Sequence, residues 1–268
     1  MPGIGIKVAG LTKRLKAATA LSCLTASFEP GLLHGVIGSD GAGKTTVLRT
    51  MVGLLHPDEG NVEYLEDGHP VPFESIRPRM AYMPQSQSLY PDLSIDEHME
   101  FFRELYRLSP DVYAGRRDRL LRLTRLADFR GRPAGKLSGG MYKKLGLMCA
   151  LLQEPAAVLL DEPTNGVDPI SRREFWELLY TLTGEGCLVI VTTAYMDEAE
   201  RCDRVHLLDS GRLLATGEPR AVLAQSGVRS FEELFLRSSG DPVAEDSGPP
   251  TGLAAGAEDS ALPTRSAP

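Results

Sequence analysis

The stretch "GSDGAGKTT", from Gly38 to Thr46, decides which fold the rest of the chain must adopt. It fits the pattern G-x-x-x-x-G-K-[ST] through Thr45. The glycines let the backbone curl so that successive N–H groups point at phosphate oxygens, and a following helix would direct its positive end to the same place. We expect Lys44 to reach the β- and γ-phosphates of a nucleotide, and the Thr45 hydroxyl to bind Mg²⁺.

The segments on either side of this loop support that interpretation. "LLHGVI" (Leu32 to Ile37) is typical of a strand, and "KTTVLRTMVGLL" is typical of a helix. The alternative, a plain glycine-rich turn, explains neither neighbour. The loop alone does not separate a kinase, a GTPase and an ATPase. The residues expected to bind the phosphates are Gly38, Ser39, Asp40, Gly41, Ala42, Gly43, Lys44, Thr45 and Thr46.

A second strand, "AAVLLDEPT", brings two carboxylates to its carboxyl end, where α/β folds bind their ligands. We expect Asp161 to hold Mg²⁺, directly or through water, and Glu162 to polarise the attacking water as a general base. An Asp-Glu-Pro turn that merely closes a strand is the alternative. The phosphate loop earlier in the chain favours the functional interpretation.

Composition limits the remaining possibilities. The chain has 268 residues, of which 42% are apolar and 24% charged, so it is large enough for a sizeable α/β core. Its apolar runs are strand-length and fall well short of the roughly 18 residues of a membrane-spanning helix. The four cysteines form no CxxC pair, which predicts reduced thiols in a cytosolic protein. A net charge of -7 argues against a broad nucleic-acid surface.

The order of elements predicts a helical insertion in an α/β core, followed by a tail. "SRREFWELLYTL" repeats apolar residues on one helix face, "CLVIV" is a buried strand, and "RVHLLDSGRLLAT" is a hairpin turning at Asp209–Gly211. Residues from about 89 to 131 are helical and charged. Residues 238–268 lack aromatics and are rich in Pro, Gly, Ala and acid, which predicts a disordered tail or linker after a domain of residues 1–237.

"KLSGGMYKKLGL" places a Ser and two glycines at the start of a helix, which is either a second anion site or an ordinary N-cap. The order of motifs decides between them: phosphate loop, "YMPQ", "LSGGM", "LLDEPT", then "NGVD". This order resembles the ATP-binding cassette (ABC) transporter ATPases over residues 5–236. "DGAGKTT", "GVDPISRRE", "YMDEAERCDRV" and "SFEELFL" are similar to the ABC-2 type drug exporters.

The resemblance implies a fold and further site residues. The fold is α/β: a P-loop NTPase (RecA-like) core with a mixed sheet and an inserted helical subdomain at about residues 89–131. Gln85 matches the glutamine that touches Mg²⁺ and links the site to a transmembrane partner. The signature motif, which would contact ATP bound by the opposite subunit, is Leu137, Ser138, Gly139, Gly140 and Met141. The D-loop at the dimer seam is Asn165, Gly166, Val167 and Asp168.

Two positions depart from the family pattern. Leu15 stands where these ATPases usually carry an aromatic residue that stacks on adenine, which removes a stacking contribution of roughly 0.5–1.5 kcal/mol. Ala194 stands where they usually carry the switch histidine that hydrogen-bonds the γ-phosphate. His206 is not a substitute, because it lies on the next strand, where we expect a partly buried residue.

The resemblance implies the ATP-binding and ATP-hydrolysing subunit of a membrane transporter, and the likeness to drug exporters implies export, with ATP and Mg²⁺ as cofactors. Its partners would be separate transmembrane permease subunits and a second cassette, in a homodimer or heterodimer, at the inner face of the cell membrane. No nucleic-acid partner is expected. One alternative is a regulatory cassette with little turnover, favoured by Ala194. Another is a soluble cassette ATPase outside transport, which usually carries two cassettes or a coiled-coil insertion.

Overall fold

The computed structural model describes residues 3–16, 18–86 and 88–239. Its central sheet has six strands in the order β10-β9-β3-β8-β7-β6. They are β3 (Leu33–Ile37), β6 (Met80–Met83), β7 (Ala157–Asp161), β8 (Leu188–Thr193), β9 (Arg204–Asp209) and β10 (Arg212–Gly217). All neighbours pair in parallel except β10, which is antiparallel to β9. The mixed sheet of the expected α/β fold is therefore confirmed.

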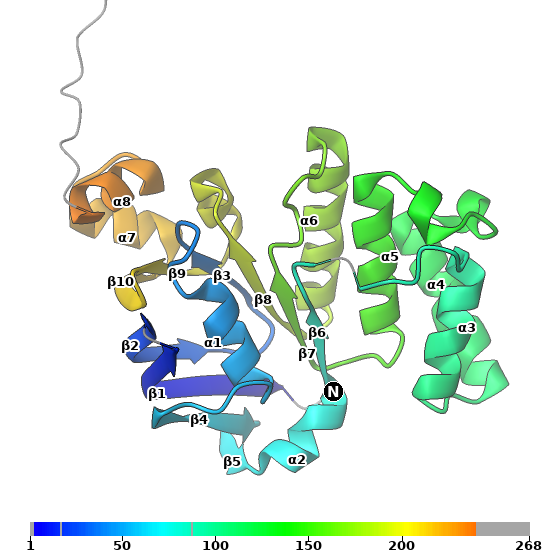
Figure 1. The fold of residues 1–268 in the computed structure, drawn as a ribbon, viewed down its shortest axis with the longest axis horizontal. Coiled ribbons are helices and arrows are strands. Elements are labelled where there is room, and N and C mark those ends of the chain that lie inside the picture. The colour runs from blue at the N-terminus through cyan, green and yellow to red at the C-terminus, as the bar shows by residue number, and fades with distance from the viewer. Residues whose placement is uncertain (1–2, 17, 87, 240–268) are drawn as a thin grey trace, which may run out of the picture.

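A second sheet, which the sequence analysis did not anticipate, is antiparallel and has the order β2-β1-β4-β5. Its strands are β1 (Ile4–Leu15), β2 (Ala18–Phe28), β4 (Glu59–Glu66) and β5 (His69–Val71). It lies beside helix α1 (Lys44–Met51), which separates it from the central sheet (Figure 1). The end of β1 thereby comes close to the phosphate loop.

The central strands are buried on both faces, as their continuous apolar runs predict. On one face, Leu160 and Val191 pack in a core that also takes in the helices α5 (Gly139–Leu151) and α6 (Pro169–Gly184). On the other face, Leu159 and Ile190 pack against α1 and the antiparallel sheet. Alternate residues of one strand thus join two separate cores, which fixes the register of the sheet.

The expected helical insertion is present. Residues 89–131 contain α3 (Ile95–Leu105), α4 (Pro110–Thr124) and the 3-10 turn η2 (Ala127–Phe129), and no strand. Together with α5 they form a lobe on one side of α6 (Figure 1). Ser94 and Glu97 begin α3 with reciprocal hydrogen bonds, since each side chain binds the backbone N–H of the other.

The remaining short elements connect these layers. They are α2 (Phe73–Ile76), α7 (Pro219–Ser226), α8 (Phe231–Ser239) and the 3-10 turns η1 (Arg77–Arg79), η3 (Ala134–Lys136) and η4 (Met196–Arg201). Helix α8 includes the first two residues of the segment expected to be a tail. Residues 240–268 of that segment lie outside the described residues. Within the described part of the chain, no helix is both long and apolar enough to cross a membrane.

A pair of buried histidines joins β3 to β9. The N–H of Glu29 donates to His34 Nε2 at 3.0 Å, and His34 Nδ1 faces His206 Nε2 at 3.2 Å. His206 Nδ1 in turn lies 3.0 Å from Thr216 Oγ1. His206 is fully buried, so the expectation of a partly buried residue was wrong in degree. Both imidazoles are neutral in this arrangement.

Burial lowers the pKa of both histidines. Desolvation lowers the pKa of His34 to about 4, with Glu29 and Asp203 opposing and Arg204 adding to the shift. Desolvation, then His34 and Arg204, lower the pKa of His206 to about 3. In an unfolded chain both would titrate near 6.5. The unfolded state therefore binds more protons below that pH, and stability is lost as the pH falls from about 6.5 towards 4.

We predict that lowering the pH from 7 to 5 reduces the free energy of unfolding by roughly 3–4 kcal/mol through these two residues, at about 1.4 kcal/mol per pKa unit each. Urea unfolding at both pH values measures the loss. The double variant His34→Gln, His206→Gln should show a much smaller loss. The exposed His69→Gln is the matched control and should behave as wild type. Equal pH dependence in all three proteins would contradict the assignment.

Candidate nucleotide site

The phosphate loop joins β3 to α1, as the pattern predicts. Gly43 lies in the left-handed region with φ 103°, immediately before the first helical residue, Lys44. Gly38 is needed for a different reason, because a Cβ there would lie 2.4 Å from the carbonyl oxygen of Leu208. The N–H of Gly38 donates to the carbonyl of Thr193 at 3.2 Å, so the loop begins beside the end of β8.

Lys44 lies at the centre of this loop and is only 4% exposed. Its ammonium group donates to the carbonyls of Gly38 and Ser39 at 2.9 and 3.0 Å. It also forms an ion pair with Glu162, 3.1 Å from Oε1. A triphosphate would supply the negative charge that Glu162 provides here, so Lys44 is placed to exchange one anionic partner for another.

The two predicted carboxylates meet the loop from β7. Thr45 Oγ1 donates to Asp161 Oδ1 at 3.0 Å, which brings together two of the predicted Mg²⁺ ligands. Glu162 Oε2 accepts from Gln85 Nε2 at 2.7 Å and from Asn165 Nδ2 at 3.2 Å. A hydroxyl, a carboxylate and an amide oxygen form a hard donor set that suits Mg²⁺. Thr45, Asp161 and Gln85 therefore fit this ion.

Lys44, Thr45, Gln85 and Glu162 line one pocket of about 400 Å³ at the carboxyl ends of the parallel strands, and the buried Asp161 is bonded to Thr45 of this lining. Leu15, 41% exposed at the end of β1, contributes to its wall, where the resemblance expects the adenine. Ala194 follows β8 directly, is exposed, and has no side-chain group that could donate a hydrogen bond to a phosphate. The pocket lining is Leu15, Ala20, Asp40, Gly41, Gly43, Lys44, Thr45, Thr46, Gln85 and Glu162.

The signature residues 137–141 do not line this pocket. Ser138 is the N-cap of α5, and its Oγ accepts from the N–H of Met141 at 3.3 Å. Gly140 packs so closely on α6 that a Cβ would lie 2.4 Å from Cβ of Ser171. Asp168, in the D-loop, caps α6 by accepting from the N–H of Ser171 at 3.0 Å. Gly139 and Gly140 also lie next to Gly166 and Val167, so residues 137–141 and 165–168 of one chain are in contact.

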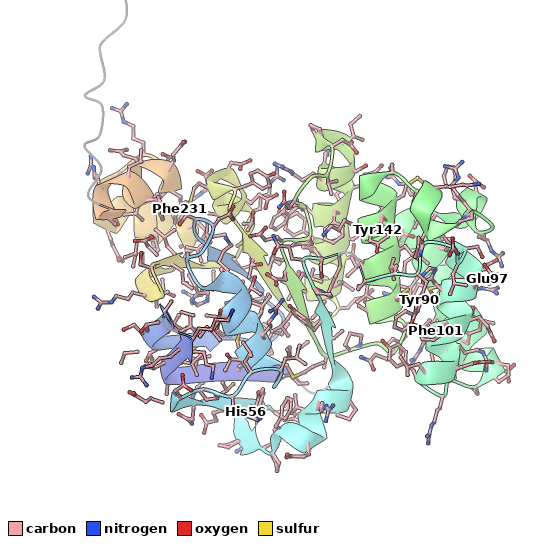
Figure 2. The ribbon with its side chains drawn as sticks, in the orientation of Figure 1. His56, Tyr90, Glu97, Phe101, Tyr142 and Phe231 are labelled. Carbon is pink, nitrogen blue, oxygen red and sulfur yellow. The ribbon has the colours of Figure 1, made fainter. Side chains whose placement is uncertain are left out.

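The signature helix also binds the segment that follows Gln85. Lys143 Nζ donates to the carbonyl of Gln85 at 3.2 Å, and the N–H of Leu89 donates to the hydroxyl of Tyr142 at 2.9 Å. Desolvation lowers the pKa of Lys143, and the charges of Glu162 and Asp161 oppose this shift. Tyr142 of α5 lies near the part of the helical lobe that contains Tyr90 (Figure 2).

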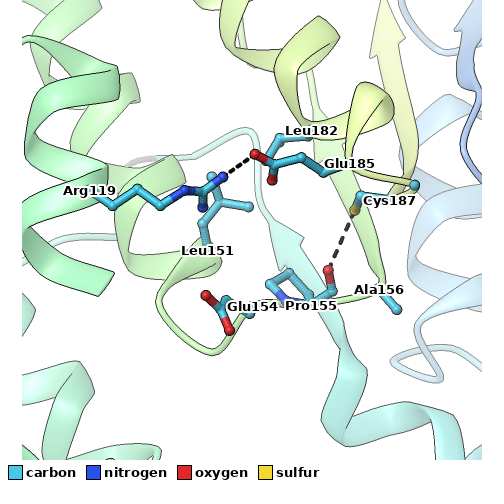
Figure 3. Close-up of a pocket in the computed structure, with 9 residues that line it drawn as sticks. Arg119, Leu151, Glu154, Pro155, Ala156, Leu182, Glu185 and Cys187 are labelled. Atoms are coloured by element: carbon cyan, nitrogen blue, oxygen red, sulfur yellow. Dashed lines mark hydrogen bonds and ion pairs between the residues drawn. The ribbon is translucent and has the colours of Figure 1, made fainter. Parts of the chain in front are cut away.

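Another hollow, of about 270 Å³, lies at the opposite end of the sheet, next to the amino ends of β7 and β8. It contains the ion pair between Arg119 and Glu185, and Cys187 Sγ faces the carbonyl oxygen of Pro155 at 3.5 Å (Figure 3). None of the predicted site residues lines it. Because parallel sheets bind ligands at their carboxyl ends, the pocket at the phosphate loop is the candidate nucleotide site.

Two hydroxyls that the sequence analysis missed also reach the carboxylates. Tyr82 OH donates to Asp161 Oδ2 at 3.2 Å, and Thr192 Oγ1 donates to Asp161 Oδ1 at 2.9 Å. Both residues are on strands next to β7 in the sheet. The only signal available in the sequence was a hydroxyl near the end of each strand.

The family model described as ABC transporter matches residues 21–165. The chain belongs to the ABC transporter family. That match begins in β2 and runs from the phosphate loop through the signature to Asn165, so it contains most of the site described above. The expected family and its P-loop fold are confirmed.

Several curated relatives are named as ATP-binding proteins of exporters. A probable multidrug ABC transporter ATP-binding protein of Escherichia coli K12 is 42% identical over 234 residues, which cover 84% of this chain and 39% of that protein. A daunorubicin resistance ATP-binding protein of Streptomyces coeruleorubidus is 37% identical, covering 90% and 76%. A Nod factor export ATP-binding protein of Ralstonia nicotianae is 35% identical, covering 83% and 71%.

Solved structures agree with the family. The structure of an ATP-binding subunit of an ABC transporter has a TM-score of 0.76 and 30% identity, covering 87% of this chain and 99% of its own. The cbiO1 protein of Clostridium perfringens, part of the cbiONQ transporter complex, has a TM-score of 0.74 and 26% identity, covering 90% and 95%.

We predict that Lys44→Ala weakens ATP binding at least tenfold, about 1.4 kcal/mol, because it removes the buried cation from the phosphates and leaves Glu162 without its partner. Isothermal titration calorimetry measures the change. Lys7→Ala, an exposed lysine on β1, is the control and should bind as wild type. Unchanged ATP affinity in Lys44→Ala would remove the basis for the phosphate-loop assignment.

We predict weak discrimination between ATP and GTP, because Leu15 covers the base without an aromatic face. Leu15→Tyr should tighten binding by about 2- to 12-fold, corresponding to a stacking gain of roughly 0.5–1.5 kcal/mol. Competition between unlabelled nucleotides and a fluorescent ATP analogue measures both effects. A wild type that strongly prefers ATP would show that another residue reads the base.

Proposed function

We propose that this chain is the ATP-hydrolysing subunit of an ABC exporter. The observation that carries the proposal is the convergence of Lys44, Thr45 and Glu162 in one pocket, with the buried Asp161 bonded to Thr45. The names of the relatives, which include multidrug and daunorubicin resistance proteins, support export. We propose that the membrane-embedded subunits select the exported substrate.

In the proposed reaction, Lys44 turns from Glu162 to the β- and γ-phosphates, which frees the carboxylate. Glu162 then accepts a proton from the water that attacks the γ-phosphorus, while the bond from that phosphorus to the β–γ bridging oxygen breaks. Thr45, Asp161 and Gln85 would hold Mg²⁺, which neutralises charge on the phosphates. Gln85 and Asn165 keep hold of the second oxygen of Glu162, which orients the base.

The partners we propose are a second cassette and separate transmembrane subunits. The signature lies outside the pocket of its own chain, which supports its use on the ATP of another cassette. The segment after Gln85 leads to exposed apolar side chains on the helical lobe, Tyr90 (56%), Phe101 (40%) and Leu105 (58%). Tyr90 and Phe101 are in contact, with ring centroids 5.7 Å apart (Figure 2). This apolar surface suits a helix of a membrane subunit and supports our proposal that the chain works at the inner face of the membrane.

A regulatory cassette with little turnover is the second candidate, and Ala194 is the observation that favours it. A transition-state donor in a dry site contributes about 10²–10³ in rate, and alanine contributes none of it. We therefore propose a slow site in the phosphate loop of this chain. Its intact signature could complete a faster site on a partner cassette that keeps the histidine. The E. coli relative is more than twice as long as this chain, since 84% of this chain aligns with 39% of it, which leaves room for such a partner.

We predict that Ala194→His accelerates single-turnover ATP hydrolysis by the purified chain at least about tenfold. Rapid-quench measurement with excess protein over labelled ATP gives the rate. Glu162→Gln in both backgrounds is the control and should stop the chemistry in each. If histidine adds less than about threefold, corresponding to about 0.7 kcal/mol, the slow-site proposal is wrong.

A further inference from the structure

The carboxylate of Asp161 is held by hydroxyl groups from three separate elements. Strand β7 lies between β6 and β8, and each neighbour supplies one donor. Tyr82 of β6 donates to Oδ2 at 3.2 Å, and Thr192 of β8 donates to Oδ1 at 2.9 Å. Thr45 of α1 donates to Oδ1 as well, at 3.0 Å. Both oxygens are therefore oriented before any cation binds.

Thr192 differs from the other two donors because it also holds the next residue. Its hydroxyl accepts a hydrogen bond from the N–H of Glu162 at 2.9 Å. Thr192 is completely buried, and it lies opposite Asp161 in the parallel register of β7 and β8. One hydroxyl thus uses its donor on Asp161 and its acceptor on Glu162, so it ties the two carboxylate residues to each other and to β8.

The backbone at Glu162 explains why this tie matters. Glu162 has φ 45°, a left-handed conformation that non-glycine residues rarely adopt. The chain turns there out of β7, and the side chain is thereby directed to Lys44, Gln85 and Asn165. The bond to Thr192 fixes the N–H at this turn. Without it, a buried N–H would have no partner and the turn could relax.

Neighbouring hydroxyls cannot replace Thr192. The hydroxyl of Thr193 accepts from the N–H of Tyr195 at 3.0 Å, and its side chain is on the opposite face of β8. Tyr82 reaches only the second oxygen of Asp161 and does not bond Glu162. The loss of the Thr192 hydroxyl would consequently affect both carboxylates at once.

We propose that Thr192 is a positioning residue for hydrolysis, which sets the Asp161 carboxylate for Mg²⁺ and the Glu162 carboxylate for the attacking water. The proposal rests on the ATPase activity proposed above. In this proposal, the residues that carry the two carboxylates share one hydrogen-bonding partner on β8, the strand that ends next to Ala194. Tyr82 supports the first carboxylate alone and is therefore the natural comparison.

The test compares variants that keep or remove the hydroxyl. Thr192→Val keeps the branched shape and removes the hydrogen bonds, whereas Thr192→Ser keeps the hydroxyl. We expect Thr192→Val to slow single-turnover hydrolysis by about 10- to 100-fold, since it displaces the base without removing it. Its ATP affinity in EDTA should stay within about twofold of wild type, and the Mg²⁺ concentration for half-maximal ATP binding should rise several-fold. Thr192→Ser should stay within about threefold of wild type in all three measurements.

Two comparisons separate positioning from general damage. Tyr82→Phe should raise the Mg²⁺ requirement with a smaller loss of rate at saturating Mg²⁺, because Glu162 keeps its support. Thr124→Val removes an equally buried hydroxyl that contacts none of the site residues, since it bonds the carbonyls of Leu120 and Leu121 in its own helix and Met148 Sδ of α5. This variant should change neither quantity. Thermal unfolding of each variant verifies the fold, and Thr192→Ala takes the place of Thr192→Val if the latter does not fold.

The outcomes distinguish this inference from the proposed function. A wild type that binds Mg-ATP without any turnover contradicts the proposed ATPase activity, while the Mg²⁺ requirement of Thr192→Val still tests the support of Asp161. If wild type hydrolyses ATP and Thr192→Val equals it in rate and Mg²⁺ requirement, the inference about Thr192 is overturned. It is overturned equally if Thr192→Ser is as impaired as Thr192→Val, since the hydroxyl would then not be the cause.

Discussion

The parallel pairing of β3, β8 and β7 is the constraint on which the site depends. It sets Ile37 opposite Thr193 and Asp161 opposite Thr192, so all three strands end at one edge. Residues more than a hundred positions apart in sequence meet there, as in the bond between Thr45 and Asp161. Because alternate residues of these strands are buried in two different cores, a slip by one residue would move each side chain into the opposite core, where the packing does not match its shape.

Most of the central fold could be predicted because its signals are local. Apolar runs give β3, β7 and β8, and the helical spacing of Phe175, Leu178, Leu179 and Leu182 gives α6, where all four are buried. The antiparallel sheet was missed, although Ile4, Ile6 and Val8 alternate as a half-buried strand should. The alternation breaks at an irregularity between Val8 and Leu11, which obscures the period. The helix α1 was also expected to be longer, but Gly53 ends it with φ 72°.

The candidate site likewise contains some residues that a local pattern predicts and others that only the tertiary structure reveals. A motif gives the residues that act on the nucleotide, since phosphate chemistry requires particular side chains at fixed spacing. The supporting contacts follow no motif, because they depend on which strands are neighbours and how they are aligned. Thr192 and Tyr82 reach Asp161 from two different strands, and Lys143 reaches Gln85 from α5. No spacing along one segment of the chain encodes such bonds, so tertiary structure is needed to find them.

The contacts of Glu162 relate the nucleotide-free state to the ATP-bound state of the proposed catalytic cycle. Lys44, Gln85 and Asn165 all bind its carboxylate, so the base is neutralised and held while no phosphate is present. A triphosphate competes for Lys44 alone and would leave the other two contacts in place. Binding therefore converts a paired carboxylate into a free base without moving it far. Since Gln85 is also held by Lys143 next to the signature, the loss of the Lys44 contact would reach, through Glu162 and Gln85, the residues that we propose serve an opposite cassette. Ala194 does not interrupt this path. A chain with a slow site of its own would thus still transmit the presence of ATP to its partner.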